Sequence, residues 1–406
     1  MSSPNGPRTG RPPTRAPHGV VSTPHYLASA AGLNLLQQGG SAVDAAIAAN
    51  SVLCVGYPHM AGLGGDGFWL IAEPGGAVRG LNASGPAAAK ATIDYYLPHS
   101  PGGEIPARGP LSVLTVPGAV DGWRLAHARY GKLDWKTLFD AAIGYARDGA
   151  PVTRSLRDWI VQDVPVLTRF PETAAIYLPG GRAPRDGDRL VQADLARSFE
   201  ELAERGPRAG FYEGSIAERM CRGLQAQGSP LSPDDFAAFE AGWVEPISSS
   251  YRGFDVVELP PNTQGFTALQ ILNLIEGFDV RAWGDGTADY YHHMAEAVKL
   301  AFADREEWLT DPDFVDIPVD ALISKPYADE RRGLIDPDRA QDIDQVQPGR
   351  KMTAAHSRRP PDGDTCYFCA ADRDGLVVSL IQSIYHDFGS AVVGGDTGII
   401  LQNRGA

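Results

Sequence analysis

The stretch Gly363–Gly375, G-D-T-C-Y-F-C-A-A-D-R-D-G, predicts a β-strand over 366–372 that ends in a tight turn. The next run, L-V-V-S-L-I-Q-S-I, predicts a second strand over 376–384, so the two strands should form a hairpin. Thr365 stands immediately before the first strand and after the polar run R-R-P-P-D-G. β-propensity accounts for a threonine at a strand start, yet a hydroxyl in this position is also a candidate nucleophile.

The chain upstream of this hairpin alternates helical and strand-like segments. A helix is predicted from Tyr26 to the Gly39-Gly40 stop, and Ser41 is placed to cap an alanine-rich helix over 42–53. Further elements are expected as strands at 68–73, 78–84 and 251–259, a mainly helical region at 116–226, helices at 266–275 and 288–308, and an exposed loop at 340–363. Helices followed by a terminal hairpin indicate a layered α/β protein.

Composition limits the class of protein. The chain has 406 residues, 43% of them hydrophobic, which is enough for a substantial core. The formal net charge of −14 argues against nucleic acid or an anionic membrane as the main partner, because phosphate binding needs a basic surface. Four cysteines in so long a chain do not form a disulfide framework and suit a reducing compartment.

The first 18 residues are rich in proline and arginine and contain no apolar core of a signal peptide. We therefore expect residues 1–18 to be a disordered tail. No run in the chain approaches the roughly 18 apolar residues of a membrane helix. A cytoplasmic protein without membrane contact is the expectation.

Several patterns that suggest cofactor or metal chemistry have simpler interpretations. G-L-G-G-D-G at 62–67 matches a dinucleotide fingerprint, but a helix precedes it and a strand follows, which is not the strand–loop–helix order that phosphate binding requires. We interpret it as a glycine loop where two backbones approach closely. Cys366-x-x-Cys369 would point its thiols to opposite faces of a strand. His292-His293 diverge on a helix, and Glu306-Glu307 suit a solvated helix end, so neither metal nor cofactor is predicted.

A threonine hydroxyl needs a base to become a nucleophile, and the sequence contains no G-x-S-x-G motif. One solution requires no histidine. If the chain is cut just before Thr365, the new α-amino group can take the proton, because such an amine titrates near pH ~7.7–8.0.

The chain resembles the γ-glutamyltranspeptidase family of N-terminal-nucleophile (Ntn) hydrolases from about residue 19 to its end. The matching segments are G-G-S-A-V-D-A-A-I-A-A (39–49), P-H-M-A-G-L-G-G-D-G-F (58–68), T-V-P-G-A-V-D-G-W (115–123), Y-R-G-F-D-V (251–256), E-A-V-K-L-A-F-A-D-R (296–305), L-T-D-P-D-F-V (309–315) and D-T-C-Y-F-C-A-A-D-R-D-G-L-V-V-S (364–379). The resemblance implies an α/β (α+β) protein with the αββα sandwich of Ntn hydrolases. It also implies one precursor cut between Asp364 and Thr365, with 19–364 in the large subunit and 365–406 at the start of the small one.

The same resemblance implies roles for individual residues. Thr365 would attack a small-molecule amide, and water or an acceptor amine would release the acyl group. Ser383 corresponds to a family hydroxyl that hydrogen-bonds the nucleophile, so it is expected to orient Thr365. Gly64, Gly65 and Asp66 are expected to form a loop near the site.

Three positions depart from the family pattern and are expected to bind the substrate. Asn82 stands where family transpeptidases have an arginine that holds the glutamyl carboxylate, and asparagine lacks the charged fork. Tyr385 replaces a substrate-binding asparagine, and Arg404 replaces a neutral residue. We hypothesise that Arg404 holds a carboxylate from a different side, so that the preferred acyl group differs from γ-glutamyl.

Only 42 residues, 365–406, follow the expected cut, whereas family small subunits are well over twice as long. The chain is therefore expected to be a C-terminally truncated fragment with little turnover by itself, because the oxyanion-hole segment would be missing. The main prediction is a γ-glutamyltransferase-family enzyme that cleaves γ-glutamyl or related amides. The alternatives are hydrolysis of a different small amide, such as oxamate, a cephalosporin-acylase-like activity, and a non-catalytic binding module.

Overall fold

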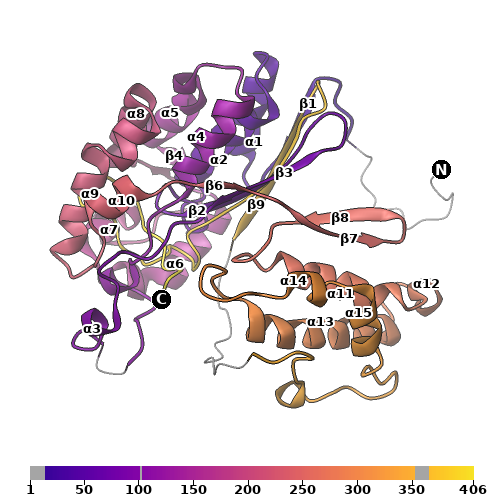
Figure 1. Ribbon diagram of the computed structural model, residues 1–406. Helices are drawn as coiled ribbons and strands as arrows, with labels where there is room; N and C mark the ends of the chain where they lie inside the picture. The colour runs from indigo at the N-terminus through magenta and orange to yellow at the C-terminus, as the bar shows by residue number, and fades with distance from the viewer. Residues whose placement is uncertain (1–13, 101–102, 353–364) are drawn as a thin grey trace.

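The computed structural model describes residues 14–100, 103–352 and 365–406. Its centre is a six-stranded sheet in which every neighbouring pair of strands is antiparallel, in the order β1-β9-β10-β2-β3-β6 (Figure 1). These strands are β1 (Gly19–Ser22), β2 (Asp66–Ala72), β3 (Val78–Ala83), β6 (Gly242–Val244), β9 (Cys366–Asp372) and β10 (Val377–Ser383). The predicted terminal hairpin is confirmed, and it lies in the middle of the sheet beside β2.

One face of this sheet is covered by helices. The alanine-rich helix α2 (Ala42–Gly56) is buried along its whole length, and it begins at a capping box formed by Ser41 and Asp44. The helices around α2 in Figure 1 pack into the same hydrophobic core. They are α1 (Tyr26–Gln37), α4 (Ala119–Tyr130), α5 (Asp140–Asp148), α6 (Arg154–Leu167), α7 (Pro171–Tyr177), α8 (Ala193–Arg205), α9 (Ser215–Gln225) and α10 (Pro233–Ala238), with α3 (Ile93–Tyr96) at the periphery. The mainly helical prediction for 116–226 is confirmed, with a two-stranded ribbon of β4 (Ala150–Pro151) and β5 (Arg189–Leu190) inserted.

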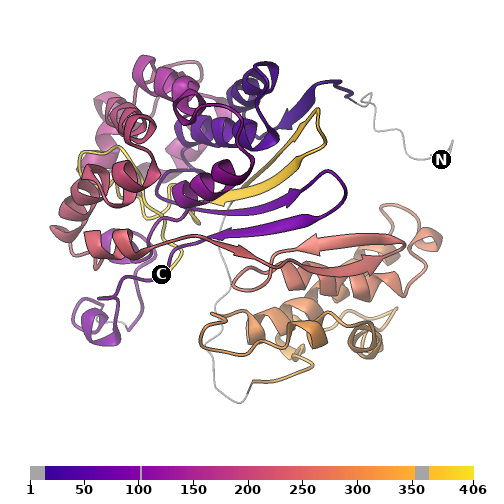
Figure 2. The ribbon, with the colours of Figure 1, turned by 45° about the horizontal axis from the view of Figure 1, so that its top comes forward.

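A second lobe follows β6 and lies to one side of the sheet (Figure 2). It consists of the hairpin β7 (Ile247–Tyr251) and β8 (Phe254–Glu258) with the helices α11 (Gly265–Glu276), α12 (Val280–Trp283), α13 (Ala288–Trp308), α14 (Val319–Leu322) and α15 (Lys325–Arg332). The prediction of one continuous strand over 251–259 is wrong, because this segment contains the end of β7, a turn and β8. Tyr251 ends β7, and the chain turns at Arg252 and Gly253, both of which have positive φ.

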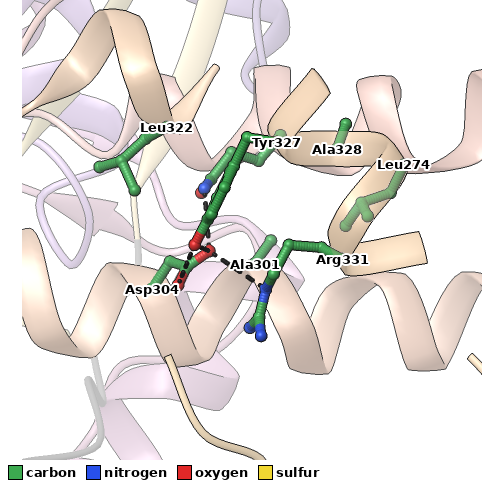
Figure 3. A pocket seen from close by; sticks show the side chains of 8 residues that line it. Leu274, Ala301, Asp304, Leu322, Tyr327, Ala328 and Arg331 are labelled. Carbon is green, nitrogen blue, oxygen red and sulfur yellow. Dashed lines mark hydrogen bonds and ion pairs between the residues drawn. The ribbon is translucent and has the colours of Figure 1, made fainter. Parts of the chain in front are cut away.

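The lobe is held together by a buried carboxylate (Figure 3). Asp304 on α13 accepts hydrogen bonds from the Tyr327 hydroxyl at 3.0 and 2.9 Å, from Gln270 Nε2 at 3.1 Å and from the Gly349 amide at 2.8 Å. Burial raises the pKa of Asp304, while the Arg331 guanidinium opposes the rise. Every oxygen of this group is used within the lobe, so the cluster has a structural role in joining α11, α13 and α15.

The opposite face of the six-stranded sheet is exposed. Tyr367 and Ile381 are paired across β9 and β10, and their exposed fractions are 55% and 41%. The six-stranded sheet and its helices thus supply one sheet and one helix layer of the predicted αββα sandwich, and the other sheets among the described residues are the two-stranded β4–β5 and β7–β8. Asp364 and residues 1–13 of the predicted tail lie outside the described residues, and the division into subunits remains a prediction.

Candidate active site

Thr365 lies at the start of β9 and is exposed. The register pairs Cys366 with Gln382, so the next position outward places Thr365 opposite Ser383. Ser383 is paired in turn with Asp66 on β2. Residues directly opposite each other in an antiparallel pair share a face of the sheet. Thr365, Ser383 and Asp66 therefore form a row across three neighbouring strands, at the end of the sheet where β9 begins.

Ser383 is buried, with an exposed fraction of 2%. Its Oγ accepts a hydrogen bond from the backbone amide of Tyr385 at 2.8 Å. This bond fixes the turn that follows β10, where Tyr385 has a φ of 78°. The predicted pair of Thr365 and Ser383 is thus brought together by the hairpin register, and Tyr385 is tied to it through the serine.

Asp66 is fully buried and accepts hydrogen bonds on both carboxylate oxygens. Its Oδ1 accepts from the Gly118 amide at 3.1 Å, the Gly85 amide at 3.3 Å and Gln402 Nε2 at 3.0 Å. Its Oδ2 accepts from Arg404 Nε at 2.9 Å. Burial raises the pKa of Asp66, and the Arg404 charge and the hydrogen bonds oppose that rise. Asp66 is thereby a fixed anchor for Arg404, a relationship that the sequence did not predict.

Gly64 and Gly65, which precede Asp66, allow the backbone before β2 to lie close to the backbone at Ile400 and Ser383. A Cβ on Gly64 would overlap the carbonyl oxygen of Ile400, and a Cβ on Gly65 would overlap that of Ser383. The interpretation of 62–67 as a loop of close backbone approach is confirmed. The loop leads into β2, so the order that a dinucleotide fingerprint requires is absent from these residues.

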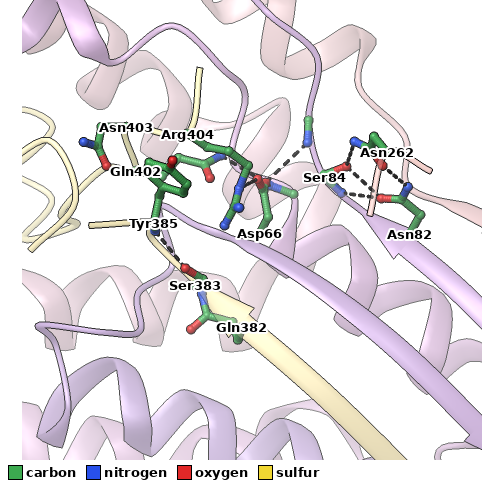
Figure 4. A network of polar contacts seen from close by, with 12 residues as sticks. Asp66, Asn82, Ser84, Asn262, Gln382, Ser383, Tyr385, Gln402, Asn403 and Arg404 are labelled. Atoms are coloured by element: carbon green, nitrogen blue, oxygen red, sulfur yellow. Dashed lines mark hydrogen bonds and ion pairs between the residues drawn. The ribbon is translucent and has the colours of Figure 1, made fainter. Parts of the chain in front are cut away.

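Arg404 extends over the site beside the Tyr385 side chain (Figure 4). Its guanidinium carbon lies 5.5 Å from the centre of the Tyr385 ring and 5.9 Å from that of Phe68. The side chain is 29% exposed, but its Nη2 is buried and has no hydrogen-bond partner among the described residues. A buried guanidinium nitrogen without an acceptor is unfavourable. Arg404 Nη2 is therefore a donor for an acceptor that the described residues do not supply.

Asn82 lies on β3, the strand next to β2, and belongs to a separate polar cluster (Figure 4). Its Nδ2 donates to Asn262 Oδ1 at 2.8 Å, and its Oδ1 accepts from the Ser84 hydroxyl at 2.7 Å. Asn262 closes the triangle by donating to Ser84 Oγ at 3.0 Å. Asn82 is paired with Phe68 on β2, and Arg404 lies over the ring of the same phenylalanine. Ser84, Asn262 and Gln402 were not among the predicted site residues.

The remaining sequence patterns do not assemble into a cofactor or metal site within the part of the chain that the structure describes. No group of three potential ligands is found there. Cys366 is buried and donates to the Gln382 carbonyl at 3.2 Å, whereas Cys369 is half-buried. Among the described helices, none has the length and apolarity needed to cross a bilayer.

The fold is that of an Ntn-hydrolase-type enzyme, and comparison with known proteins gives the family. The family model described as Gamma-glutamyltranspeptidase matches residues 28–406, so the chain belongs to that family. The glutathione hydrolase-like YwrD proenzyme of Bacillus subtilis is 44% identical over 388 residues, which is 95% of this chain and 70% of that protein. The glutathione hydrolase proenzyme of Escherichia coli is 37% identical over 97% of this chain and 67% of that protein.

Among solved structures, a cephalosporin acylase from Bacillus halodurans superposes with a TM-score of 0.87 at 37% identity, over 100% of this chain and 72% of that one. The predicted family, fold class and enzymatic nature are therefore confirmed. The comparisons bear out the main prediction, a γ-glutamyltransferase-family enzyme, and not the alternatives of another small amide or a non-catalytic binding module. The roles of individual site residues remain predictions.

Proposed function

We propose that this chain, in its complete and processed form, hydrolyses γ-glutamyl amides of the glutathione type through an acyl-enzyme on Thr365. The observation that carries the proposal is the position of Thr365 at the exposed start of β9, opposite Ser383 and in line with the Asp66–Arg404 pair. A nucleophile, a hydroxyl that can orient it and a cation then lie at one end of one sheet.

The first reaction in the proposal is self-processing. The Thr365 hydroxyl attacks the carbonyl carbon of Asp364, the peptide C–N bond breaks, and the resulting ester is hydrolysed by water. Thr365 then carries a free α-amino group that acts as its base. The relatives named proenzymes support a single precursor for both subunits.

In the second reaction Thr365 attacks the substrate amide, the amine leaves, and water or an acceptor amine takes the acyl group. Ser383 positions the nucleophile in this scheme. Its Oγ accepts from the Tyr385 amide, and a hydroxyl that accepts one hydrogen bond can still donate its own hydrogen to the threonine oxygen.

Arg404 is proposed to bind the carboxylate of the acyl group. Asp66 holds the guanidinium through Nε, which leaves the two Nη groups at the end of the fork for the substrate, and the buried Nη2 has no acceptor among the described residues. Tyr385 forms the wall behind the guanidinium, and Asn82 with its amide cluster is proposed to contact the far end of the acyl chain. A cytoplasmic location, with no membrane and no nucleic-acid partner, belongs to the proposal and is supported by the low cysteine content and the acidic charge.

Intact mass and N-terminal sequencing of the complete gene product test the processing step. Wild-type protein is expected to yield a fragment that begins with Thr365, and the Thr365→Ala variant is expected to stay uncut. A fragment that begins at Cys366, or a single chain that persists in the wild type, contradicts the proposal.

Turnover is then measured on γ-glutamyl p-nitroanilide, glutathione and oxamate. We expect hydrolysis of the two γ-glutamyl compounds, abolished by Thr365→Ala and retained at a reduced rate by Thr365→Ser. Processed protein that hydrolyses oxamate but neither γ-glutamyl compound would refute the proposed substrate while leaving the nucleophile intact.

A further inference from the structure

The loop that follows β10, here loop 384–391, has an unusual backbone. Tyr385, Phe388 and Ala391 have φ values of 78°, 52° and 63°, a region that residues with a Cβ rarely occupy. Such conformations persist where the surroundings determine them. The contacts that hold loop 384–391 therefore also determine where the Tyr385 ring lies beside the Arg404 guanidinium.

Arg108 makes three of these contacts. Its Nη1 donates to the backbone carbonyl oxygens of Asp387 and Gly389, the latter at 2.6 Å. Its Nη2 donates to Asp387 Oδ2 at 3.1 Å, in an ion pair whose side chains are 19% and 18% exposed. The next residue, Gly109, donates its amide to the Ser390 carbonyl at 2.8 Å. One planar guanidinium thus binds two backbone groups and one charged side chain of the loop, a geometry that a lysine ammonium does not reproduce.

Asn403 joins the segment that carries Arg108 to the neighbours of both site residues. The buried Asn403 side chain donates through Nδ2 to the Ala107 carbonyl at 2.5 Å. Its Oδ1 accepts from the His386 amide at 3.2 Å, and its Nδ2 lies 2.7 Å from His386 Nδ1. His386 follows Tyr385 in the chain, and Asn403 precedes Arg404. Segment 107–109 therefore contacts both the loop that carries the tyrosine and the strand end that carries the arginine.

The far half of loop 384–391 has supports that do not involve Arg108. The Phe388 amide donates to the His59 carbonyl at 2.9 Å, in the turn after α2. Thr173 Oγ1, on α7, donates to the Ala391 carbonyl at 2.8 Å. Removal of the Arg108 side chain should therefore loosen the half of the loop that contains Tyr385 without unfolding the protein.

We propose that Arg108 is a positioning residue for the site: it holds loop 384–391 so that the Tyr385 ring stays against the Arg404 guanidinium. The hydrogen bonds of Arg108 found among the described residues all go to this loop, so Arg108 acts through Tyr385. The activity readout of this inference rests on the proposed function, in which Arg404 binds the acyl carboxylate. A loosened loop should then weaken substrate binding more than the chemical step.

The first test is steady-state kinetics of the complete, processed enzyme on γ-glutamyl p-nitroanilide. Arg108→Ala is expected to be processed like the wild type and to raise KM by about tenfold, the lower end of the effect of losing a hydrogen bond to a charged group. Its kcat should fall by less than KM rises. Arg147→Ala, which removes an exposed arginine paired with Glu200, is the matched control and should keep the wild-type KM.

Two milder variants grade the same contact. Arg108→Lys keeps the charge but not the fork, and should lie between the wild type and Arg108→Ala. Asp387→Asn leaves both backbone carbonyls for Arg108 and removes only the charge of the partner, so its KM should rise less than that of Arg108→Ala. If Arg108→Ala does not fold, these two variants are compared with the wild type in its place. An unchanged KM in the Arg108 variants overturns the proposal.

Hydrogen exchange provides a readout that needs no turnover. The amides of Tyr385, His386 and Gly389 are hydrogen-bonded, so their exchange reports on the loop. In Arg108→Ala they should exchange about tenfold faster, while the β9–β10 hairpin keeps its protection. Unchanged protection of the loop overturns the proposal, as does an equal loss in the hairpin, which indicates general unfolding. If the wild type turns over no γ-glutamyl compound, the proposed function fails, and the exchange measurement still decides whether Arg108 holds the loop.

Discussion

Arg404 donates its Nε–H to Asp66 Oδ2 across 2.9 Å, and this ion pair joins the end of the described chain to the start of β2. The two partners differ in their exposure to solvent: Asp66 is buried, while the Arg404 side chain is 29% exposed. The carboxylate is fixed by three further donors, so the guanidinium is held in one orientation above the Tyr385 ring. In the proposed function, this fixed cation selects acyl groups that carry a carboxylate.

Arg404→Ala is expected to raise KM for γ-glutamyl p-nitroanilide by about 10–100-fold, because a hydrogen bond to a charged group contributes ~1.5–3 kcal/mol. Arg404→Lys should lie between the variant and the wild type, since an ammonium group keeps the charge but lacks the planar fork. Steady-state kinetics give both values. Arg129→Ala, which removes an exposed arginine paired with Glu73, serves as the control. An unchanged KM for anionic amides in Arg404→Ala would show that the carboxylate binds elsewhere.

Ser383→Ala is expected to lower kcat by about 10²-fold with little change in KM, because misplacement of a reacting group by about 1 Å has an effect of that size. Ser379 provides the matched control on the same strand and the same face. The Ser379 hydroxyl contacts Tyr367 Oη at 3.3 Å, and Tyr367 is two residues further along β9 than Thr365. Ser379→Ala should therefore leave kcat within twofold of the wild type. Equal loss in both variants would point to a general effect on β10.

Gly65→Ala is expected to destabilise the protein by about 1–3 kcal/mol and to lower activity, because a Cβ at this position overlaps the Ser383 carbonyl oxygen. Gly144→Ala is the contrasting variant: this glycine lies inside α5, and its Cβ would meet no atom within 4 Å. Alanine there should raise the free energy of unfolding by up to about 1 kcal/mol. Urea denaturation of both variants gives the comparison, and a Gly65→Ala protein as stable as the wild type would contradict the packing argument.

The elements of the fold follow from local patterns that the sequence displays. The capping box at Ser41, the strand periodicity on either side of the D-R-D-G turn and the glycine loop at 62–67 each act over a few residues, and each is observed as predicted. The turn at Arg252 and Gly253 was missed, because the strand-like alternation of 251–259 continues through it.

The site was predictable only where a family pattern marks it. Thr365 and Ser383 are paired by hairpin register, which their spacing about a turn determines. The partner of Arg404 is 338 residues away in the sequence, and the Asn82 cluster depends on Asn262, 180 residues away. Contacts of this kind are set by tertiary packing and leave no local periodicity.

Asp163 on α6 is buried, and burial together with the neighbouring Asp387 raises its pKa, so the stability of the protein depends on pH. Because the folded-state pKa of Asp163 is raised to about 8, the folded protein binds a proton that the unfolded chain has released above its ordinary pKa. This contribution to stability is fully present below the ordinary aspartate pKa and is lost as pH rises through about 8. The lowered pKa of Asp387 acts in the other direction and only at acidic pH, where its stabilising contribution is lost as pH falls through the folded-state value. We therefore expect the free energy of unfolding of the wild type, relative to that of Asp163→Asn, to decrease between pH 5 and pH 9 in urea titrations. A difference that is constant or grows over this range would mean that Asp163 is ionised in the folded protein.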